Sequence, residues 1–452
     1  MRVRLAHRLL VAFTLLVSTG VCARAQDDNG EIIHLGVERS SVPRVRVRFL
    51  PLENAATAPG ATDGLVALAS RLARDLYYSG LIELVEPLPP GVTSPAPAGR
   101  SGEGDSELAA PEYGLTLHLE GAAADNLTWT VRLLEPSGDM RLGLRYSVDL
   151  AGIAPSVHHF SDQVVNQLTG EQGIAQTRVL FSRGSGDHRE LYVVDYDGEN
   201  LRQVTRNGSL NLTPRWSPDG KSISYTSYEK GRQRLLLLET ATGQSTRVGD
   251  FQGLNVGAAW SPTGNELAVT LSRDGNSEIY RIRPDGRVLA RATFEPSIEC
   301  SPAWDPSGQQ IAYTSDRTGS PQIYVMDAVG ANRRRVTFEG NYNDSAAWSP
   351  RADRIAYVSR ASGLFTIFTV APDGSELQRI TFPADRDNED PSWAPDGRHL
   401  VVSSNRTGYT TLWIIDVDSG EARALTRGKG IDTGPCWSGP PASAQAASAG
   451  DN

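Results

Sequence analysis

Short apolar runs that alternate with polar residues fill the chain from about residue 178 to residue 437 and predict many short β-strands. The runs repeat with a unit whose fullest form is Trp-Ser-Pro-Asp-Gly. Six tryptophans mark the repeats: Trp216, Trp260, Trp304, Trp348, Trp393 and Trp437. They stand 44 or 45 residues apart. A period in the low forties, built of strands and turns, is typical of β-propeller blades.

Each repeat predicts four strands. The turn after the tryptophan reverses the chain, because Pro presets φ and Gly accepts the left-handed conformation. In one repeat, strand-like runs follow at residues 355–357, 367–370 and 379–381. Four strands per repeat make one blade, and we interpret the repeated tryptophans as packing residues between neighbouring blades.

The first and last repeats are incomplete in complementary ways. Residues 178–205 supply three strands without a tryptophan strand, whereas residues 431–437 supply only the tryptophan strand. Joining them completes a sixth blade and leaves no open sheet end. We therefore predict a six-bladed β-propeller over residues 178–438, followed by a disordered tail at 439–452.

Residues 44–173 mix the two periodicities. Val45, Val47 and Phe49 alternate with arginines, which predicts a half-buried strand. Leucines follow at helical spacing from residue 65 to residue 76, and a second helix is expected from about Ser156 to Gly170. This region is expected to form a small α/β domain, so that the whole chain is mainly β. Its segment 87–111 is rich in Pro, Gly, Ala and Ser and is interpreted as a disordered loop.

The first 25 residues have the pattern of a secretory signal. A basic start precedes the apolar run Leu9–Val17, and Ala23-Arg24-Ala25 supplies a small-x-small cleavage pattern. Processing as a lipoprotein at Cys22 is the alternative, which the bulky Val21 disfavours. We expect an exported protein without a membrane span, beginning with an extended segment at residues 26–43.

Charge limits the choice of partner. The chain has 44 basic and 53 acidic residues. The first 25 residues contain four arginines and no acid, so the mature chain would carry 40 basic against 53 acidic residues. Such an acidic balance argues against a nucleic-acid partner, which requires a basic face.

The sequence shows no catalytic apparatus. Gly-x-Ser-x-Gly, His-Glu-x-x-His, a phosphate loop and Cys-x-x-Cys are all absent. Only His188 and His399 lie in the repeats, too few for a histidine-rich metal site, and we interpret His158-His159 as a surface pair. We therefore expect no catalytic residues, no metal ligands and no bound cofactor.

Two cysteines remain in the predicted mature chain. Cys300 and Cys436 fall on the innermost strands of opposite blades. Because a disulfide needs Cα atoms within about 7 Å, we predict two free thiols.

One position of the repeat suggests a binding site. Five residues before each tryptophan stands an amide or an acid: Asn211, Asn255, Glu299, Asn343, Asn388 and Asp432. The strand that carries them should line the channel, so these side chains, with Asp344, Asp387, Glu389 and Asp390, would ring one mouth. Such a ring fits a partner protein or a cation in the channel. The alternative is that these residues only satisfy turns and solvent.

Several motifs give the chain a family resemblance. They are Trp-Ser-Pro-Asp-Gly, Ser-Asp-Arg-Thr-Gly, Ile-Tyr-Val-Met-Asp, the signal sequence and the junction from Ser161-Asp162 through Leu168 to Arg178. With these, residues from about 31 to 438 resemble the TolB family, periplasmic components of the Tol-Pal system. Arg46 and Arg48, where the family has apolar strand residues, and the Pro-rich loop depart from its pattern.

The resemblance implies a function in protein docking. It implies binding of the peptidoglycan-associated lipoprotein Pal at the channel mouth, near Asn255, Glu299, Asn343, Asp344 and Asn388. It also implies binding of TolA through the segment from about Gln26 to Val37. The implied role is to keep the outer membrane tethered and to constrict it during division, by a protein that we expect to be a monomer.

Two other functions remain open at this stage. A propeller-type periplasmic enzyme would need either a hydrolase domain, for which no residues remain, or a histidine-rich metal centre. A module that binds cell-wall glycan would need neither.

Overall fold

The computed structural model describes most of the chain between residues 44 and 439. The described residues are 33–34, 44–54, 61–93, 95, 112–123, 126–229, 231–249, 251–361, 363–381 and 386–439. The predicted signal sequence, most of the predicted loop 87–111 and nearly all of the predicted tail lie outside them, as does the segment 26–43 apart from residues 33–34. The chain divides into two compact units, Val37–Gln176 (the N-terminal unit) and Met1–Gly36 with Thr177–Asn452 (the propeller unit).

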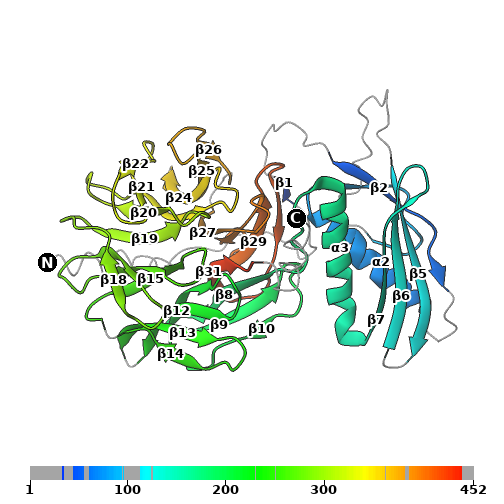
Figure 1. Cartoon of the computed structure of the whole chain (residues 1–452), viewed down its shortest axis with the longest axis horizontal. Coiled ribbons are helices and arrows are strands. Elements are labelled where there is room, and N and C mark those ends of the chain that lie inside the picture. Colours follow the sequence, from blue (N-terminus) through cyan, green and yellow to red (C-terminus); the bar gives the residue numbers. More distant parts are fainter. Residues whose placement is uncertain are drawn as a thin grey trace. The chain divides into compact units, whose positions relative to one another are not determined.

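The N-terminal unit is a mixed sheet with two long helices (Figure 1). The sheet has the order β4-β2-β5-β6-β7, with β2 parallel to β4 and β5, the other neighbours antiparallel and β3 added parallel to β5. Its strands are β2 (Val45–Phe49), β3 (Glu53–Asn54), β4 (Ile82–Val85), β5 (Tyr113–Ala123), β6 (Asn126–Leu134) and β7 (Met140–Val148). Its helices are α2 (Ala61–Tyr78), a short 3-10 turn at Leu150–Gly152, and α3 (Ile153–Thr169).

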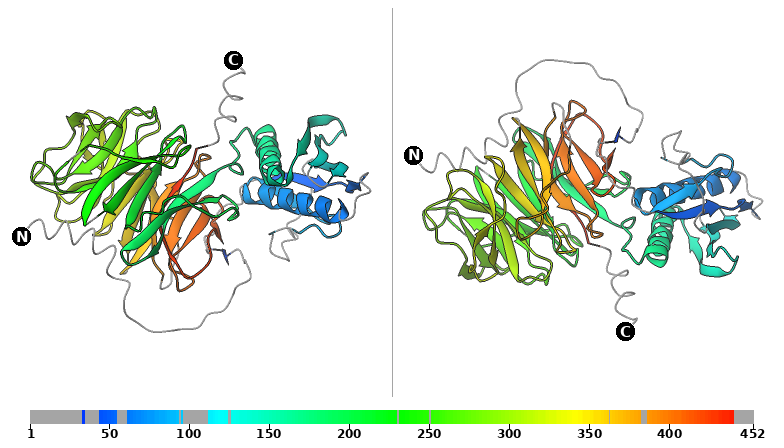
Figure 2. Two further views of the ribbon diagram at one scale, coloured as in Figure 1. Left: turned by 90° about the horizontal axis from the view of Figure 1, so that it is seen from below. Right: turned by 90° about the horizontal axis from the view of Figure 1, so that it is seen from above.

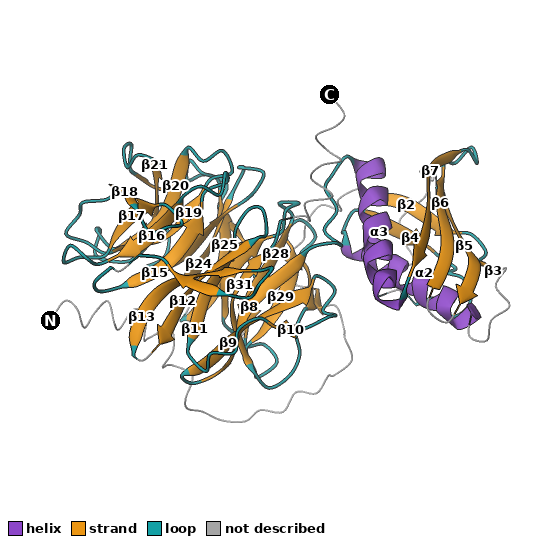
Figure 3. Ribbon diagram, turned by 60° about the horizontal axis from the view of Figure 1, so that its bottom comes forward, coloured by secondary structure: helices purple, strands orange, loops and turns teal. Residues whose placement is uncertain are grey.

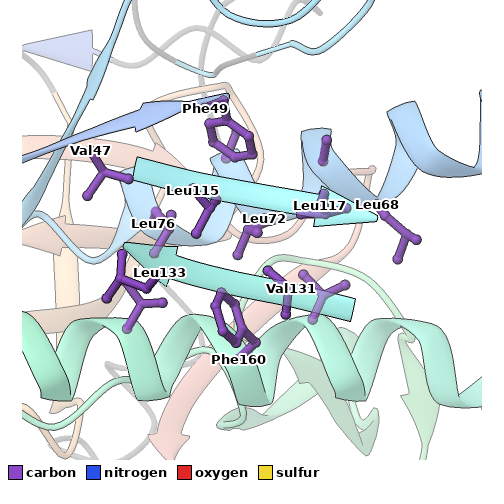
Figure 4. Close-up of a cluster of buried hydrophobic side chains, with 14 of the residues drawn as sticks. Val47, Phe49, Leu68, Leu72, Leu76, Leu115, Leu117, Val131, Leu133 and Phe160 are labelled. Atoms are coloured by element: carbon purple, nitrogen blue, oxygen red, sulfur yellow. The ribbon is translucent and has the colours of Figure 1, made fainter. Parts of the chain in front are cut away.

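The core of this unit lies between the helices and one face of the sheet (Figure 4). Val47 and Phe49 of β2 alternate with arginines and are buried against Leu72 of α2 and Phe160 of α3, as the sequence pattern predicts. On the other face, the Arg46 and Arg48 guanidinium groups lie 2.9 and 2.7 Å from the Glu112 carboxylate. The two arginines therefore leave the apolar face of the strand intact.

One expectation for this unit was wrong. His158 does not belong to a surface pair but is buried, 4% exposed, with its Nδ1 atom 2.7 Å from Oδ2 of Asp75 on α2. His159 is half-buried and its Nδ1 lies 2.7 Å from the Tyr146 hydroxyl. Consecutive residues of a helix point about 100° apart, so one histidine can face α2 while the other faces the sheet.

The junction motif of the sequence closes the N-terminal unit. The Asp162 carboxylate on α3 accepts the backbone N–H of Ala175 at 2.7 Å and that of Gln176 at 3.1 Å. The returning segment lies so close that a Cβ added to Gly173 would stand 2.5 Å from the Asp162 Cα atom. Burial raises the pKa of Asp162 to about 6, although these hydrogen bonds oppose that shift. The motif therefore fixes where the segment leaves α3.

The propeller unit consists of six four-stranded antiparallel sheets, which confirms the predicted six-bladed β-propeller (Figures 1 and 2). The blade completed by both ends of the repeat region contains β31 (Ile431–Trp437), β8 (Arg178–Ser185), β9 (His188–Asp195) and β10 (Arg202–Gln203). The second contains β11 (Asn211–Trp216), β12 (Ser222–Glu229), β13 (Arg232–Glu239) and β14 (Ser245–Arg247). The third contains β15 (Asn255–Trp260), β16 (Leu267–Leu271), β17 (Glu278–Ile282) and β18 (Val288–Arg291).

The remaining blades follow in chain order. The fourth contains β19 (Glu299–Trp304), β20 (Gln310–Ser315), β21 (Gln322–Asp327) and β22 (Arg334–Arg335). The fifth contains β23 (Asn343–Trp348), β24 (Ile355–Ala361), β25 (Leu364–Val370) and β26 (Gln378–Arg379). The sixth contains β27 (Asn388–Trp393), β28 (His399–Ser404), β29 (Thr411–Asp416) and β30 (Glu421–Ala424), and its sheet gains β1 (Ile33–His34) antiparallel to β30.

The ring closes where the sequence predicts. β31 pairs with β8, so that Trp437 lies opposite Val179. The Trp437 indole N–H donates to the Thr177 hydroxyl at 2.7 Å, and the backbone N–H of Ser438 donates to the Arg178 carbonyl at 2.8 Å. The returning strand is thus fixed by side chain and backbone at its last residues.

The repeated tryptophans connect neighbouring blades, as we interpreted them. The Trp304 indole N–H donates to the carbonyl of Ala259 in the preceding blade at 3.2 Å, and that of Trp393 donates to Ala347 at 3.0 Å. Trp393 also belongs to a buried cluster that joins the fifth and sixth blades. Within the described part of the chain, neither long helix combines the length and hydropathy that a membrane crossing requires.

Exchanging glycine for alanine tests the junction. We expect Gly173→Ala to lower the free energy of unfolding of the N-terminal unit by about 1–3 kcal/mol, because the added methyl group would overlap the Asp162 backbone. Gly64→Ala on α2 is the matched control: its methyl group would meet no atom within 4 Å, so we expect a gain of roughly 0.5–1 kcal/mol. Hydrogen exchange of the α3 amides measures both. Equal protection in the two variants would contradict the proposed close contact.

Candidate partner-binding site

The innermost strand of each blade is the end strand of its sheet. These strands are β11, β15, β19, β23, β27 and β31. Four of them, β11, β15, β19 and β31, are labelled in Figure 3. Because an end strand has one unpaired backbone edge, this edge faces the channel and its side chains point along the two faces of the sheet, toward neighbouring blades.

All six innermost strands share one irregularity. The residue three positions before the tryptophan adopts a left-handed conformation, with φ between 48° and 63°. These residues are Thr213, Gly257, Ser301, Ser345, Asp390 and Gly434. The pairing register shifts at the same place in every blade, which identifies a β-bulge. Each inner strand therefore bends at the equivalent residue of its blade.

The six residues that stand five positions before the tryptophans, which we call the column, lie just before these bulges, and their side chains are buried. Asn211, Asn255, Glu299, Asn343, Asn388 and Asp432 are between 0% and 4% exposed. Asn343 is typical: its amide donates to the Glu339 carbonyl and to the Gln322 side chain, both at 2.8 Å. These six side chains do not form a ring of exposed acceptors, because they are buried and hydrogen-bond inside the blades or to the connections between blades. The geometry favours the alternative in which they satisfy turns.

Two acids of this column hold arginines of the nearby hairpins. Asp432 accepts two hydrogen bonds from Arg183, each 2.7 Å long, and Glu299 lies 3.1 Å from Arg317. In the sixth blade the equivalent arginine, Arg406, donates to the neutral Asn388 at 2.8 Å and lies over the Trp413 ring. Burial without a carboxylate partner lowers the pKa of Arg406 to about 10.

Three of the other predicted acids lie one or two residues further along the inner strands, and the fourth, Asp387, directly precedes Asn388. Asp344 accepts the Thr314 hydroxyl of the preceding blade at 2.7 Å. Asp390 accepts the backbone N–H of Gly434, on the next inner strand, at 2.9 Å. Burial raises the pKa of Glu389 to about 8, with further contributions from Asp390 and Asp387. Glu389 is therefore largely protonated at neutral pH.

The channel residues were also candidates for a cation site. Among the described residues of the propeller's inner strands, no three acidic or thiol groups bring ligand atoms within 4.8 Å of one another. A cation in the channel thus finds no preformed cluster of carboxylate or thiol ligands on these strands. The predicted free thiols are confirmed, since Cys300 and Cys436 form no disulfide. Burial raises the pKa of both thiols, which makes them poor nucleophiles.

Comparison with known proteins identifies the family. The model of the TolB beta propeller domain matches residues 165–395, which is just over half of the chain. The chain belongs to the TolB family. This result confirms the resemblance seen in the repeat and junction motifs.

Two curated relatives show how far the TolB likeness extends in sequence. The Tol-Pal system protein TolB of Methylobacillus flagellatus is 32% identical over 244 residues, covering 53% of this chain and 54% of that protein. The Protein TolB homolog of Chlorobium chlorochromatii is 34% identical over 204 residues, covering 44% of this chain and 46% of that protein. The chain therefore aligns with about half the length of these relatives.

A solved TolB structure extends the likeness of fold. The crystal structure of TolB from Acinetobacter baumannii is similar with a TM-score of 0.71, covering 90% of this chain and 100% of that chain. The sequence identity is 24%. At that identity, the comparison supports the shared fold of this TolB-family chain.

The role of the buried column can be tested in this TolB-family propeller by removing one charge. We expect Asp432→Asn to lower the free energy of unfolding by roughly 2–4 kcal/mol, because it leaves the partly buried Arg183 without its carboxylate. Asp353→Asn, in the more exposed pair with Arg354, is the control and should change stability by less than about 1 kcal/mol. Denaturant unfolding measures both. Equal stability of the two variants would show that the column does not brace the ring.

The raised pKa of Glu389 predicts a pH dependence. Its folded-state pKa, about 8, lies above the ordinary value of 4.5 for a glutamate, so the folded chain binds the proton more tightly than the unfolded chain does. This group's contribution should therefore destabilise the fold as pH rises from about 5 to about 8, by about 1.4 kcal/mol for each unit of pKa shift. Glu389→Gln should reduce the loss of stability between pH 5.5 and pH 9. Parallel curves for the wild type and the variant would contradict the assignment.

Proposed function

We propose that this chain is a periplasmic docking protein of a Tol-Pal-like system rather than an enzyme. The observation that carries the proposal is the match of the TolB propeller family to half of the chain. Its curated relatives are named as components of the Tol-Pal system. The proposed role is to help maintain outer-membrane integrity and constriction at division, and the proposed compartment rests on the predicted signal sequence.

The proposed partner at the channel mouth is a peptidoglycan-associated lipoprotein. The proposed binding surface is the end of the ring at which each inner strand begins. In each blade, the hairpin between the second and third strands and the connection to the next blade lie at this same end. We call this end the connection face. A closed ring of antiparallel sheets holds such loops in fixed positions, which lowers the entropy cost of docking. The buried column supports this face from within, and Asp344 and Glu389 follow it by one residue on their strands.

The proposed partner of the N-terminal segment is a TolA-like protein, bound through residues from about Gln26 to Val37. Only Ile33 and His34 of this segment are among the described residues. Their backbone is extended and pairs with Ala422 and Glu421 of β30. An extended backbone suits recognition by strand pairing, one of the recurring modes of peptide binding.

The two alternatives have less support. An enzyme would need a nucleophile, base or metal set, and the titratable groups described on the inner strands are held in internal hydrogen bonds or have their charged forms suppressed by burial. A glycan-binding module would typically offer exposed aromatic and amide groups together. The amides of the repeated column are buried.

Binding measurements test the proposal. The full chain should bind the soluble domain of a peptidoglycan-associated lipoprotein from the same envelope, as measured by calorimetry. It should also bind the C-terminal domain of a TolA-like protein, and deletion of residues 26–37 should remove this second interaction without affecting the first. Binding of soluble wall fragments with no binding of the lipoprotein would overturn the proposal.

A further inference from the structure

The outermost strands of five blades end in the same way. A buried threonine places its hydroxyl oxygen 2.8–3.0 Å from a backbone N–H of the third strand. These threonines are Thr205, Thr293, Thr337, Thr381 and Thr426. The strand then leaves the sheet at the connection face, so the next residue emerges at an equivalent position in each blade. In the described residues that position holds Arg206, Phe294, Phe338 and Arg427.

The third and fourth blades carry phenylalanine at this position. Phe294 is 65% exposed and Phe338 is 68% exposed, which is unusual for so large an apolar side chain. An arginine lies over each ring: Arg291 is 4.7 Å from the centre of Phe294, and Arg335 is 5.3 Å from the centre of Phe338. The rings are thus held in place by cation–π contacts without being covered. Two positioned, exposed aromatic rings on adjacent blades are typical of a protein-binding surface.

The sixth and first blades carry positive charge instead. Arg206 and Arg427 are exposed at the equivalent position, and Lys429 is exposed two residues further along. None of the three has an ion-pair partner among the residues that the structure describes. In a ring of six blades, the sixth blade stands opposite the third and the first opposite the fourth. The basic residues and the phenylalanines therefore occupy opposite sides of one face.

We propose that one folded protein docks across the connection face, placing an apolar patch on Phe294 and Phe338 and an acidic patch on Arg206, Arg427 and Lys429. This inference rests on the proposed function and specifies the surface that the lipoprotein of that proposal would use. The aromatic side supplies burial, which stabilises the complex once formed. The basic side attracts and orients an acidic partner, which acts mainly on the association rate. A partner that carries both patches can therefore dock in only one orientation about the ring axis, although the ring has six similar blades.

Paired substitutions in the full chain test the two sides separately. The double variant Phe294→Ser with Phe338→Ser should weaken binding of the lipoprotein domain at least tenfold, mainly through faster dissociation. Its control is Val329→Ser with Leu377→Ser, which removes two exposed apolar side chains from turns between third and fourth strands, at the opposite end of the ring. This control should bind like the wild type.

The basic side has its own variant and control. Arg206→Ser with Arg427→Ser should slow association several-fold and reduce its dependence on salt between 50 and 300 mM, since exposed charges act over roughly a Debye length of 10 Å. The control is Arg283→Ser with Arg287→Ser, which removes the same charge from an exposed turn at the opposite end. Thermal unfolding of each variant checks that the ring is intact.

The outcomes separate this inference from the proposed function. Loss of affinity in the phenylalanine variant together with loss of salt dependence in the arginine variant supports both. If the wild type binds the lipoprotein and both variants bind equally well, the docking surface lies elsewhere and only this inference fails. If the wild type does not bind the lipoprotein, the proposed function fails, and with it the inference that names this partner.

Discussion

The pairing of β31 with β8 joins segments about 260 residues apart, and the ring depends on it. Chain statistics put the entropy cost of closing such a loop at about 5 kcal/mol. Hydrogen bonds at the seam return only about 1 kcal/mol each after exchange with water, so burial of the returning strand is also needed. Cys436 and Trp437, 8% and 5% exposed, supply that burial. A closed ring in turn fixes where the described strands end at the connection face.

The propeller could be predicted from sequence because its information is local and repeated. Each turn after a tryptophan depends on Pro and Gly within five residues, and the period of 44 or 45 residues fixes the length of a blade. The complementary ends at residues 178–205 and 431–437 then determine the number of blades. The helices and first strand of the N-terminal unit followed from spacing in the same way. Distant contacts are not needed for any of these steps.

The direction of side chains was harder to predict. The sequence shows that the position five residues before each tryptophan is special, but a strand pattern alone does not say which edge of the strand is unpaired. Because the free edge faces the channel, Asn343 and its equivalents turn into the blades. Buried His158 illustrates the same limit on a helix, since its partner Asp75 is 83 residues away in the chain. Both cases depend on contacts that no local pattern contains.

The contrast between repeated and unrepeated positions distinguishes scaffold from recognition. The tryptophan turn, the inner-strand bulge and the outer-strand threonine recur because each blade must solve the same packing problem. The residue after the threonine is exposed and does not take part in this packing. It is arginine on one side of the ring and phenylalanine on the other. A partner cannot distinguish rotations of a symmetric ring, so specificity requires positions that break the symmetry. Residues that differ between equivalent blades while remaining exposed are therefore where the recognition of a partner can be encoded.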